Sequence, residues 1–411
     1  MKIIPKVLYI TPHNPSNLDG GAIGNRKILF PLTSLYNEGK LDLRIITLGD
    51  GYSDSFLIRT CSKSRLRAIL ARVFLLSNQL ELYASNIIAF ISKYKPDIVI
   101  MQSSRLGRIS RSIRQIKDKS EKSKPFVVQH FDNFEKKASI FYKRKLPVIL
   151  RFLESLITSR SEYRCLKFAD HALFLHEQEA KEVLDHYKIK LDYTIMPLYY
   201  AEMNNELLKE YKQKDENDFK LLFTGSLNFY PNIEAAEYLL SLISELSFIV
   251  SAETGKELCL IIMGSGARRN LEKKVDSLRG RFNIKLIINP QDNISKEVFY
   301  SSDVYASPIF SGPGMKTKVV EALFFGLPII ASDITLKGYE ELYPYANSII
   351  FPFRGMDKEE FLRVAKKAIR HIYLKDKREL VWEIKSIYKK HYNLDRFKNL
   401  LMKVIEDFDR R

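Results

Sequence analysis

The sequence has few cysteines, no long apolar segment and no internal repeat. Cys61, Cys165 and Cys259 are far apart, odd in number and without metal-ligand spacing, which indicates a reducing cytosol. No apolar run reaches about 18 residues, so we expect no transmembrane helix. The N-terminal apolar run is too short and too interrupted for a signal peptide and is typical of a first strand. We therefore expect a cytoplasmic protein.

Acidic residues are too few to balance the basic ones. The chain has 66 Lys and Arg against 49 Asp and Glu, a net charge of +17. Residues 1–200 hold 33 basic and 19 acidic side chains, which is +14 and leaves +3 for the remainder. Residues 101–150 alone carry 13 basic and 4 acidic side chains. This excess predicts an anionic partner for the first half: a membrane surface, a lipid pyrophosphate or nucleic acid.

The length of 411 residues is too great for one typical core and predicts two domains. Residues 201–218 are highly polar and are expected to be the linker. This places a first domain at 1–200 and a second at 219–390. A last helix at 391–411 is expected to pack back toward the first domain.

The first domain opens with a strand at 7–11, a glycine-containing loop, a helix and a second strand at 43–48. This order is typical of a doubly wound α/β domain. The glycines follow the spacing Gly20-Gly21-x-x-Gly24, so the G-x-G-x-x-G dinucleotide fingerprint is missing. Two interpretations stay open for Gly21: a loop that faces the substrate, or a simple turn of the chain.

A polar cluster follows the expected strand at 125–130. His130 ends this strand, and Asp132 comes two residues later. The carboxyl end of a parallel strand is where doubly wound domains place chemistry. His130 and Asp132 are therefore the candidate catalytic residues.

Two basic helical segments are predicted in the first domain. Within 62–94, an apolar stripe runs among Lys and Arg, and it either lies on an anionic bilayer or covers the sheet; we favour the sheet. The segment 105–124 is predicted to be a strongly basic helix, in which Arg105, Arg108, Arg111, Arg114 and Lys117 surround a buried stripe. Aromatic residues are not interleaved there, so a lipid surface is preferred to nucleic acid. The stripe of the first segment is Leu66, Ile69, Leu70, Val73 and Phe74.

The stretch 307–332 predicts a strand, a glycine-rich turn, a helix from about Met315 to Phe325, and another strand. A helix that begins after such a turn has free N–H groups, which suit a phosphate. Lys318 and Glu321 share the face opposite the apolar stripe, where a cation and a carboxylate could grip a nucleotide. The alternative is an exposed ion pair that contributes roughly 0.2–0.5 kcal/mol.

The run from Gly312 through Lys318 and Glu321 to Ser332 resembles the donor-site signature of GT-B glycosyltransferases, especially the family-4 (group 1) type. The resemblance implies that Lys318 meets the donor diphosphate and Glu321 binds the nucleotide ribose. The segment 219–236, with its Gly-Ser and Pro-Asn pairs, closely resembles another element of that family. The further donor-binding residues implied by the resemblance are Gly225, Ser226, Asn232, Gly264 and Asn289.

The sequence departs from the family where many members carry a first glutamate. Pro313 occupies that position, so contacts to the donor sugar are expected from backbone N–H groups around Gly314 and Met315. Lys316 and Lys318 are expected to neutralise the diphosphate. No Asp-x-Asp pair ends a strand, so a metal-independent mechanism without a cofactor is expected. Asp132 stands where the family often has histidine.

The resemblance implies two Rossmann-like domains facing a cleft, with the C-terminal helix crossing back to the first. It implies a hexosyltransferase-like enzyme that moves a sugar from a nucleoside-diphosphate donor, such as a UDP-sugar, to a lipid-linked or oligosaccharide acceptor, with retention. The setting would be bacterial capsule or O-antigen synthesis, at the inner face of the cytoplasmic membrane. Alternatives are a non-catalytic scaffold of the same fold, a sugar-nucleotide epimerase, and nucleic-acid binding through residues 101–150.

Overall fold

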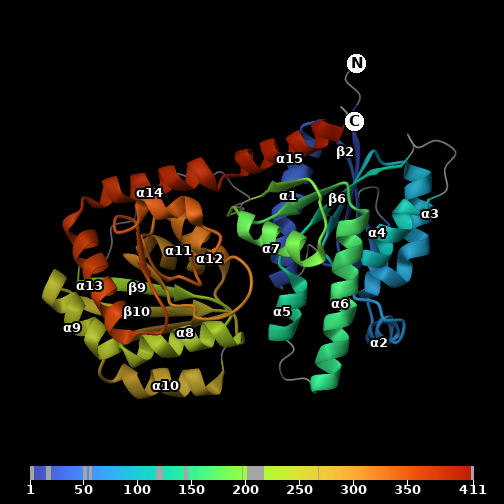
Figure 1. The fold of residues 1–411 in the computed structure, drawn as a ribbon. Helices are drawn as coiled ribbons and strands as arrows, with labels where there is room; N and C mark the ends of the chain where they lie inside the picture. Colours follow the sequence, from blue (N-terminus) through green and yellow to red (C-terminus); the bar gives the residue numbers. More distant parts are fainter. Residues whose placement is uncertain are drawn as a thin grey trace. The chain divides into compact units, whose positions relative to one another are not determined.

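A computed structural model describes residues 4–14, 20–49, 53–54, 58–116, 124–142, 147–196, 198–200, 217–266 and 268–408. The chain divides into two compact units (Figure 1). Unit 1 comprises Met1–Ala201 and Leu394–Arg411, and unit 2 comprises Glu202–Asn393. Most of the expected linker 201–218 lies outside the described residues.

Unit 1 is built on an eight-stranded sheet in the order β3-β4-β2-β1-β5-β6-β7-β8. Its strands pair in parallel, except that β3 pairs antiparallel with β4 at one edge. The central strands β5 and β6 are buried at every position, as expected for strands covered on both faces. The strands are β1 (Lys6–Ile10), β2 (Asp42–Gly49), β3 (Ser53–Asp54), β4 (Ile58–Ser62), β5 (Ile98–Gln102), β6 (Phe126–His130), β7 (His171–Phe174) and β8 (Tyr193–Ile195).

Helices cover the sheet of unit 1, and the C-terminal helix is one of them. Four buried residues of α15 join the core around β1 and α1: Phe397, Leu401, Val404 and Ile405. The expected return of this helix to the first domain is thereby confirmed. The helices are α1 (Gly20–Asn37), α2 (Arg65–Val73), η1 (Gln79–Tyr83), α3 (Ala84–Tyr94), α4 (Gly107–Arg114), α5 (Glu135–Tyr142), α6 (Val148–Phe168), α7 (Glu177–Tyr187) and α15 (Leu394–Phe408).

Three predictions for unit 1 are wrong in detail. Helix α1 begins at Gly20, so Gly20, Gly21 and Gly24 lie in its first turns and not in a loop. The basic segment 105–124 forms a helix only from Gly107 to Arg114 among the described residues. The apolar stripe of α2 does not cover the sheet; Ala71 is its buried residue, and the large apolar side chains face outward.

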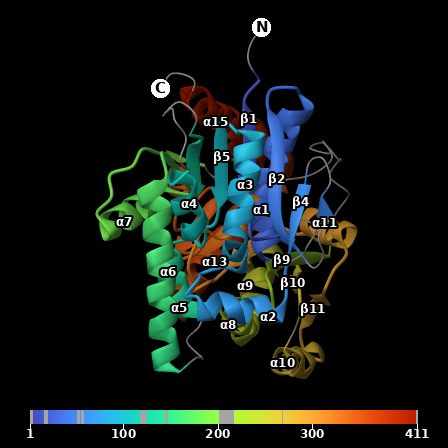
Figure 2. The same cartoon turned by 90° about the vertical axis from the view of Figure 1, so that its right-hand side faces the viewer.

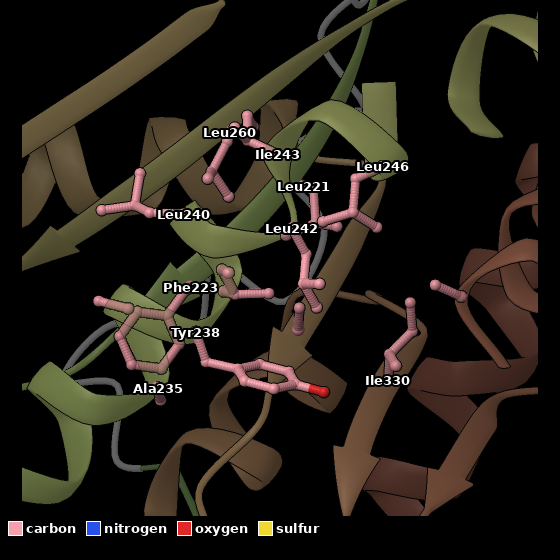
Figure 3. Close-up of a cluster of buried hydrophobic side chains, with 14 of the residues drawn as sticks. Leu221, Phe223, Ala235, Tyr238, Leu240, Leu242, Ile243, Leu246, Leu260 and Ile330 are labelled. Carbon is pink, nitrogen blue, oxygen red and sulfur yellow. The ribbon is translucent and has the colours of Figure 1, made fainter. Parts of the chain in front are cut away.

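Unit 2 has a six-stranded parallel sheet in the order β11-β10-β9-β12-β13-β14. Its core joins strands to helices, with Leu221, Phe223 and Leu260 facing Tyr238 and Leu246 (Figure 3). The strands are β9 (Asp218–Thr224), β10 (Glu257–Gly264), β11 (Asn283–Ile288), β12 (Val304–Ser307), β13 (Ile329–Ser332) and β14 (Ile350–Phe353). The helices are α8 (Tyr230–Ser241), α9 (Ile243–Thr254), α10 (Arg269–Arg279), α11 (Asp292–Ser301), α12 (Thr317–Phe324), η3 (Glu340–Tyr345), α13 (Lys358–Leu374) and α14 (Lys377–His391).

Both units are therefore parallel sheets surrounded by helices, and the predicted fold class of two doubly wound, Rossmann-like domains is confirmed. Among the helices of the described residues, none combines the length and the hydrophobicity that crossing a bilayer requires.

Candidate functional site

The loops after β9 and β10 meet through backbone contacts at the carboxyl edge of the unit 2 sheet. The N–H of Gly225 donates to the carbonyl of Met263 at 3.1 Å, and the N–H of Leu227 donates to the carbonyl of Ser265 at 2.8 Å. A Cβ atom on Gly264 would lie 1.7 Å from the carbonyl oxygen of Gly225. Because no side chain fits there, glycine at position 264 lets the two strand ends touch.

The predicted residues of α8 and β11 lie around this contact. The Asn232 side chain packs against Gly225, where a Cβ would lie 2.7 Å from its Cγ, and its Nδ2 donates to the carbonyl of Ser226 at 3.0 Å. Asn289 has φ of +50°, and its N–H donates to the carbonyl of Gly264 at 2.8 Å. The structure thus brings Gly225, Ser226, Asn232, Gly264 and Asn289 together at one sheet edge.

The glycine-rich loop before α12 has the shape that a helix N-terminus needs to bind an anion. Gly312 and Gly314 have φ of +106° and +72°, values that glycine adopts without strain. Helix α12 begins at Thr317, two residues later than predicted, and Met315 is buried. Lys316 occupies the N-cap position and makes no side-chain cap bond. The helix N-terminus therefore lacks a side-chain cap, an arrangement that suits a phosphate.

Lys316 is turned into the loop itself. Its Nζ donates to the carbonyls of Gly312, Pro313 and Gly314 at 3.0, 3.0 and 2.8 Å. Burial, with a smaller effect of the Lys337 charge, lowers the pKa of Lys316 to about 8. An ammonium group has three donors, and all three are used here. Lys316 therefore holds the loop in shape, a role that the sequence did not indicate.

Lys318 and Glu321 form an ion pair on the polar face of α12. The Lys318 side chain is 39% exposed and that of Glu321 is 12% exposed, so the carboxylate lies mostly beneath the surface. Burial raises the pKa of the Tyr305 hydroxyl, and the nearby Glu321 charge raises it further. Tyr305 in turn contacts Thr224 at the end of β9, with 3.3 Å between the two hydroxyl oxygens. Glu321 is thus close to the strand end that carries Gly225.

Sequence reasoning missed Tyr339, which is completely buried beside this loop. Its hydroxyl donates to the carbonyl of Lys316 at 2.8 Å, 23 residues away in the chain. Thr335 supports the preceding strand end in the same way, because its Oγ1 donates to the carbonyl of Ser307 at 2.7 Å. Neither residue has a sequence signal, because each acts only through the fold.

A second polar cluster lies at the carboxyl edge of the unit 1 sheet. Thr11, just after β1, donates to Oε1 of Gln102 at 2.6 Å. Gln102, the last residue of β5, donates to Oδ2 of Asp132 at 2.9 Å. His130 Nδ1 lies 3.4 Å from Oδ1 of Asp132. The two predicted catalytic residues are therefore neighbours, and Thr11 and Gln102 orient the carboxylate.

His130 is buried, and neither of its ring nitrogens has a hydrogen-bond partner. Burial lowers the pKa of His130, although the Asp132 charge opposes this. The imidazole is therefore neutral near pH 7. A neutral imidazole has one donor and one acceptor nitrogen, so it could exchange a proton with a bound hydroxyl.

The buried Glu162 of α6 fixes the loop that carries Asp132. Its carboxylate accepts from the N–H groups of Glu135 and Lys136 at 2.8 and 3.0 Å. It also accepts from the hydroxyls of Ser104 and Tyr187 at 3.1 and 2.8 Å. Burial raises the pKa of Glu162 to about 7, against the effect of these donors.

Gly21 and two further histidines of unit 1 have simpler surroundings. Gly21 lies in the first turn of α1 in unit 1. His176 caps α7, because its Nδ1 accepts from the N–H of Glu179 at 3.3 Å. His171 contacts the Thr194 hydroxyl at 2.9 Å. Across the residues that the structure describes, no three or more His, Cys, Asp or Glu residues cluster in a way that could hold a metal ion.

Comparisons with known proteins agree with this geometry. Residues 218–369 match the model of the family Glycosyl transferases group 1. Among solved structures, sucrose-phosphate synthase from Thermosynechococcus elongatus is 13% identical, with a TM-score of 0.68 over 99% of both chains. The catalytic domain of starch synthase IV from Arabidopsis thaliana, bound to ADP and acarbose, is 12% identical, with a TM-score of 0.64 over 100% of both chains.

WaaG, a glycosyltransferase involved in lipopolysaccharide biosynthesis, is 14% identical, with a TM-score of 0.62 over 97% of this chain and 99% of its own. No curated protein matches the chain by sequence. At these identities the structural likeness shows the fold of the chain, and the family match shows the nature of its second unit. The chain is a glycosyltransferase with the GT-B fold, and residues 218–369 are its group 1 domain.

Proposed function

We propose that this glycosyltransferase transfers a sugar from a nucleoside-diphosphate sugar, bound at the carboxyl edge of the unit 2 sheet, to a lipid-linked glycan. The observation that carries the donor site is the α12 N-terminus, which has no side-chain cap and stands beside a lysine and a mostly buried carboxylate. A phosphate would accept from the free N–H groups of its first turn. Lys318 would exchange its partner Glu321 for the diphosphate, and Glu321 would accept from the ribose hydroxyls.

The leaving diphosphate carries the negative charge that develops as the sugar departs. With the diphosphate at the α12 N-terminus, the helix dipole and the Lys318 ammonium would stabilise this charge as a metal ion does in other enzymes. We propose a metal-independent mechanism on this basis. Contacts to the sugar come from the backbone N–H groups of Gly314 and Met315, because Pro313 cannot supply a carboxylate. Retention of configuration is proposed from the family resemblance.

We assign the acceptor to unit 1. The Gln102–Asp132 bond fixes one carboxylate oxygen at the sheet edge, 2.9 Å from the amide nitrogen. Asp132 orients the acceptor hydroxyl or supports positive charge at the sugar, and the neutral His130 moves the proton. Unit 1 holds most of the net positive charge, which favours an acceptor with a lipid phosphate or pyrophosphate. This points to surface-polysaccharide synthesis at the inner face of the cytoplasmic membrane.

The test is a thermal-shift screen with UDP, GDP, dTDP, ADP and CMP, followed by binding of the best nucleotide to Glu321→Ala and Glu245→Ala. Glu245 is exposed on α9 and serves as the matched control. One nucleotide should raise the melting temperature of the wild type and of Glu245→Ala, and should shift Glu321→Ala far less. Equal shifts in the two variants would refute the ribose assignment.

A non-catalytic scaffold remains the second candidate, because Pro313 replaces the carboxylate that many related enzymes use. The two proposals differ in turnover. The enzyme releases the nucleoside diphosphate from its sugar donor, slowly to water and faster with a lipid-linked acceptor. A scaffold binds the same nucleotide without releasing product.

A further inference from the structure

Unit 1 has a cavity of about 220 Å³ at the place where β1, β2 and β4 end. Residues of α2 and of the start of η1 form the rest of its wall. In Figure 2, α2 lies below β2 and β4, at the end of the sheet away from the N-terminus of the chain. Pockets for drug-sized ligands usually span roughly 300–1,000 Å³, so this cavity suits a small ligand or one group of a larger ligand.

The charged side chains in the cavity wall are cations. Of the described residues that line it, Lys63, Arg72 and Arg105 are basic and none is acidic. The two arginines pair with carboxylates that do not line the cavity, Arg72 with Glu154 and Arg105 with Glu135. Arg105 uses Nε and Nη2 for this pair, and its Nη1 has no partner in the described part of the chain. Lys63 is exposed and makes no ion pair with any described residue, so its positive charge is not balanced.

The neutral side chains in the wall leave donors, not acceptors, for a ligand. Oδ1 of Asn78 accepts from the N–H of Leu80 at 2.9 Å, and Oε1 of Gln79 accepts from the N–H of Ser64 at 3.2 Å. Both amide oxygens are therefore used within the fold, whereas neither NH2 group has a partner among the described residues. Glu81, the acidic residue of η1, does not line the cavity. A wall with cations and spare N–H donors favours an anion.

A chain of three hydrogen bonds joins this cavity to the polar cluster of Asp132. The N–H of His13, which lines the cavity, donates to Oγ1 of Thr11 at 3.2 Å. Thr11 donates to Gln102 at 2.6 Å, and Gln102 donates to Asp132 at 2.9 Å. Arg105 pairs with the first residue of α5, which follows the loop that carries Asp132. An anion in the cavity is therefore held by the same sheet edge as the proposed catalytic carboxylate.

We propose that this cavity binds the phosphate or pyrophosphate group of the acceptor. Lys63 and Nη1 of Arg105 supply charged donors, which form the stronger hydrogen bonds to phosphate oxygens, and the amides of Asn78 and Gln79 supply neutral ones. The inference rests on the proposed function, because it names the part of a lipid-linked acceptor that unit 1 recognises. The bound group anchors the acceptor at the sheet edge that carries Asp132.

The first test is isothermal titration calorimetry of the full chain with inorganic pyrophosphate, in the presence of a saturating nucleoside diphosphate that occupies the donor site. Lys63→Gln removes the unbalanced cation. Gln79→Glu keeps an acceptor oxygen for Ser64 and replaces the NH2 group by a carboxylate oxygen. Each substitution should weaken pyrophosphate binding by about tenfold or more. Lys93→Gln and Gln178→Glu are the matched controls, because they make the same charge changes at exposed positions of α3 and α7.

The two controls should bind pyrophosphate as the wild type does. Because Lys63 is exposed and unpaired, Lys63→Gln should also keep the melting temperature of the wild type, and it decides the test if Gln79→Glu does not fold. Pyrophosphate binding that is absent, or equal in the variants and the controls, would overturn the proposal. If no nucleotide binds to the chain, the same titration without nucleotide makes the same comparison, so the result does not depend on the donor site.

Steady-state kinetics separates an acceptor phosphate from a free anion. With a sugar linked to a lipid pyrophosphate, both variants should raise KM by about tenfold and change kcat by less than about twofold. With an alkyl glycoside of the same sugar, KM should stay at the value of the wild type. Equal changes with the two acceptors, or no change with either, would overturn the acceptor assignment in favour of a site for free phosphate. If neither acceptor is turned over, the calorimetry decides whether the cavity binds the anion, and the nucleotide screen separately decides the donor site.

Discussion

Substitution of Lys316 tests whether the side chain of this residue holds the loop before α12 in shape. The substitution Lys316→Met keeps most of the aliphatic stem and removes the three donors that bind the carbonyls of Gly312, Pro313 and Gly314. A bond from a charged donor contributes about 1.5–3 kcal/mol, so three contribute at least about 4.5 kcal/mol. The fall of the Lys316 pKa from 10.5 to about 8 offsets roughly 3 kcal/mol of this. We expect the variant to lose about 1–2 kcal/mol of stability.

Nucleotide binding should suffer more than stability. A released loop must be ordered again when the diphosphate binds, at about 1 kcal/mol for each of three residues. These roughly 3 kcal/mol correspond to a fall in nucleoside-diphosphate affinity of about a hundredfold. Isothermal titration calorimetry measures this loss, and urea unfolding measures the stability change.

The control is Lys318→Met, which removes the cation assigned to the diphosphate. If a lysine contacts the diphosphate directly, nucleotide affinity falls as the salt concentration rises, because dissolved ions screen the attraction between the two charges. Lys318→Met should flatten this salt dependence, whereas Lys316→Met should keep the slope of the wild type. If Lys316→Met flattens the slope as strongly as Lys318→Met, then Lys316 contacts the ligand and the loop-holding role is wrong.

The same substitution has a pH signature. The native pKa of Lys316, about 8, is below its unfolded value of 10.5, so the folded protein releases this proton first as the pH rises. Between about pH 8 and 10.5 the unfolded chain binds more protons, and the free energy of unfolding of the wild type should rise relative to Lys316→Met. Urea unfolding at pH 7.5 and pH 10 tests this. A constant difference between the two proteins would contradict the lowered pKa.

Further predictions concern the two sheet edges. Gly264→Ala should destabilise unit 2 by about 2 kcal/mol or more, since its Cβ would meet backbone at 1.7 Å, whereas Gly280→Ala, with open space around it, should be neutral in urea unfolding. Asp132→Asn should lower kcat at least tenfold with unchanged nucleotide affinity; turnover within a few-fold of the wild type would remove its catalytic role. Because the pKa of Glu162 is raised to about 7, the folded chain retains a proton that the unfolded chain loses. The free energy of unfolding should therefore fall from about pH 4.5 to 7, and Glu162→Gln should remove that slope.

The sequence predicted the donor loop closely because its signals are local. Gly312 and Gly314 break the chain, Gly326 has φ of +76° where the helix ends, and these positions set the helix within two residues. The i,i+3 pairing of Lys318 with Glu321 also depends only on helical spacing. Features that depend on the backbone period of one helix could therefore be derived.

Contacts between distant segments could not be derived. Thr11 bonds to Gln102 across 91 residues, and Gln102 bonds to Asp132 across 30. The strand order β1-β5-β6 decides which polar side chains meet at this sheet edge. No pattern within a single strand encodes that order. The polar cluster was expected at the end of one strand, but its members come from three.

The stripe on α2 shows why an amphipathic pattern does not identify what covers the apolar face. The spacing of Leu66, Ile69 and Val73 predicts a shared face, and it is equally consistent with a sheet or with a lipid surface. The structure decides against the sheet, because the residue that α2 buries is the small Ala71. The same spacing would serve either covering, so only the packing of α2 within unit 1 shows that Leu66, Ile69 and Val73 face solvent.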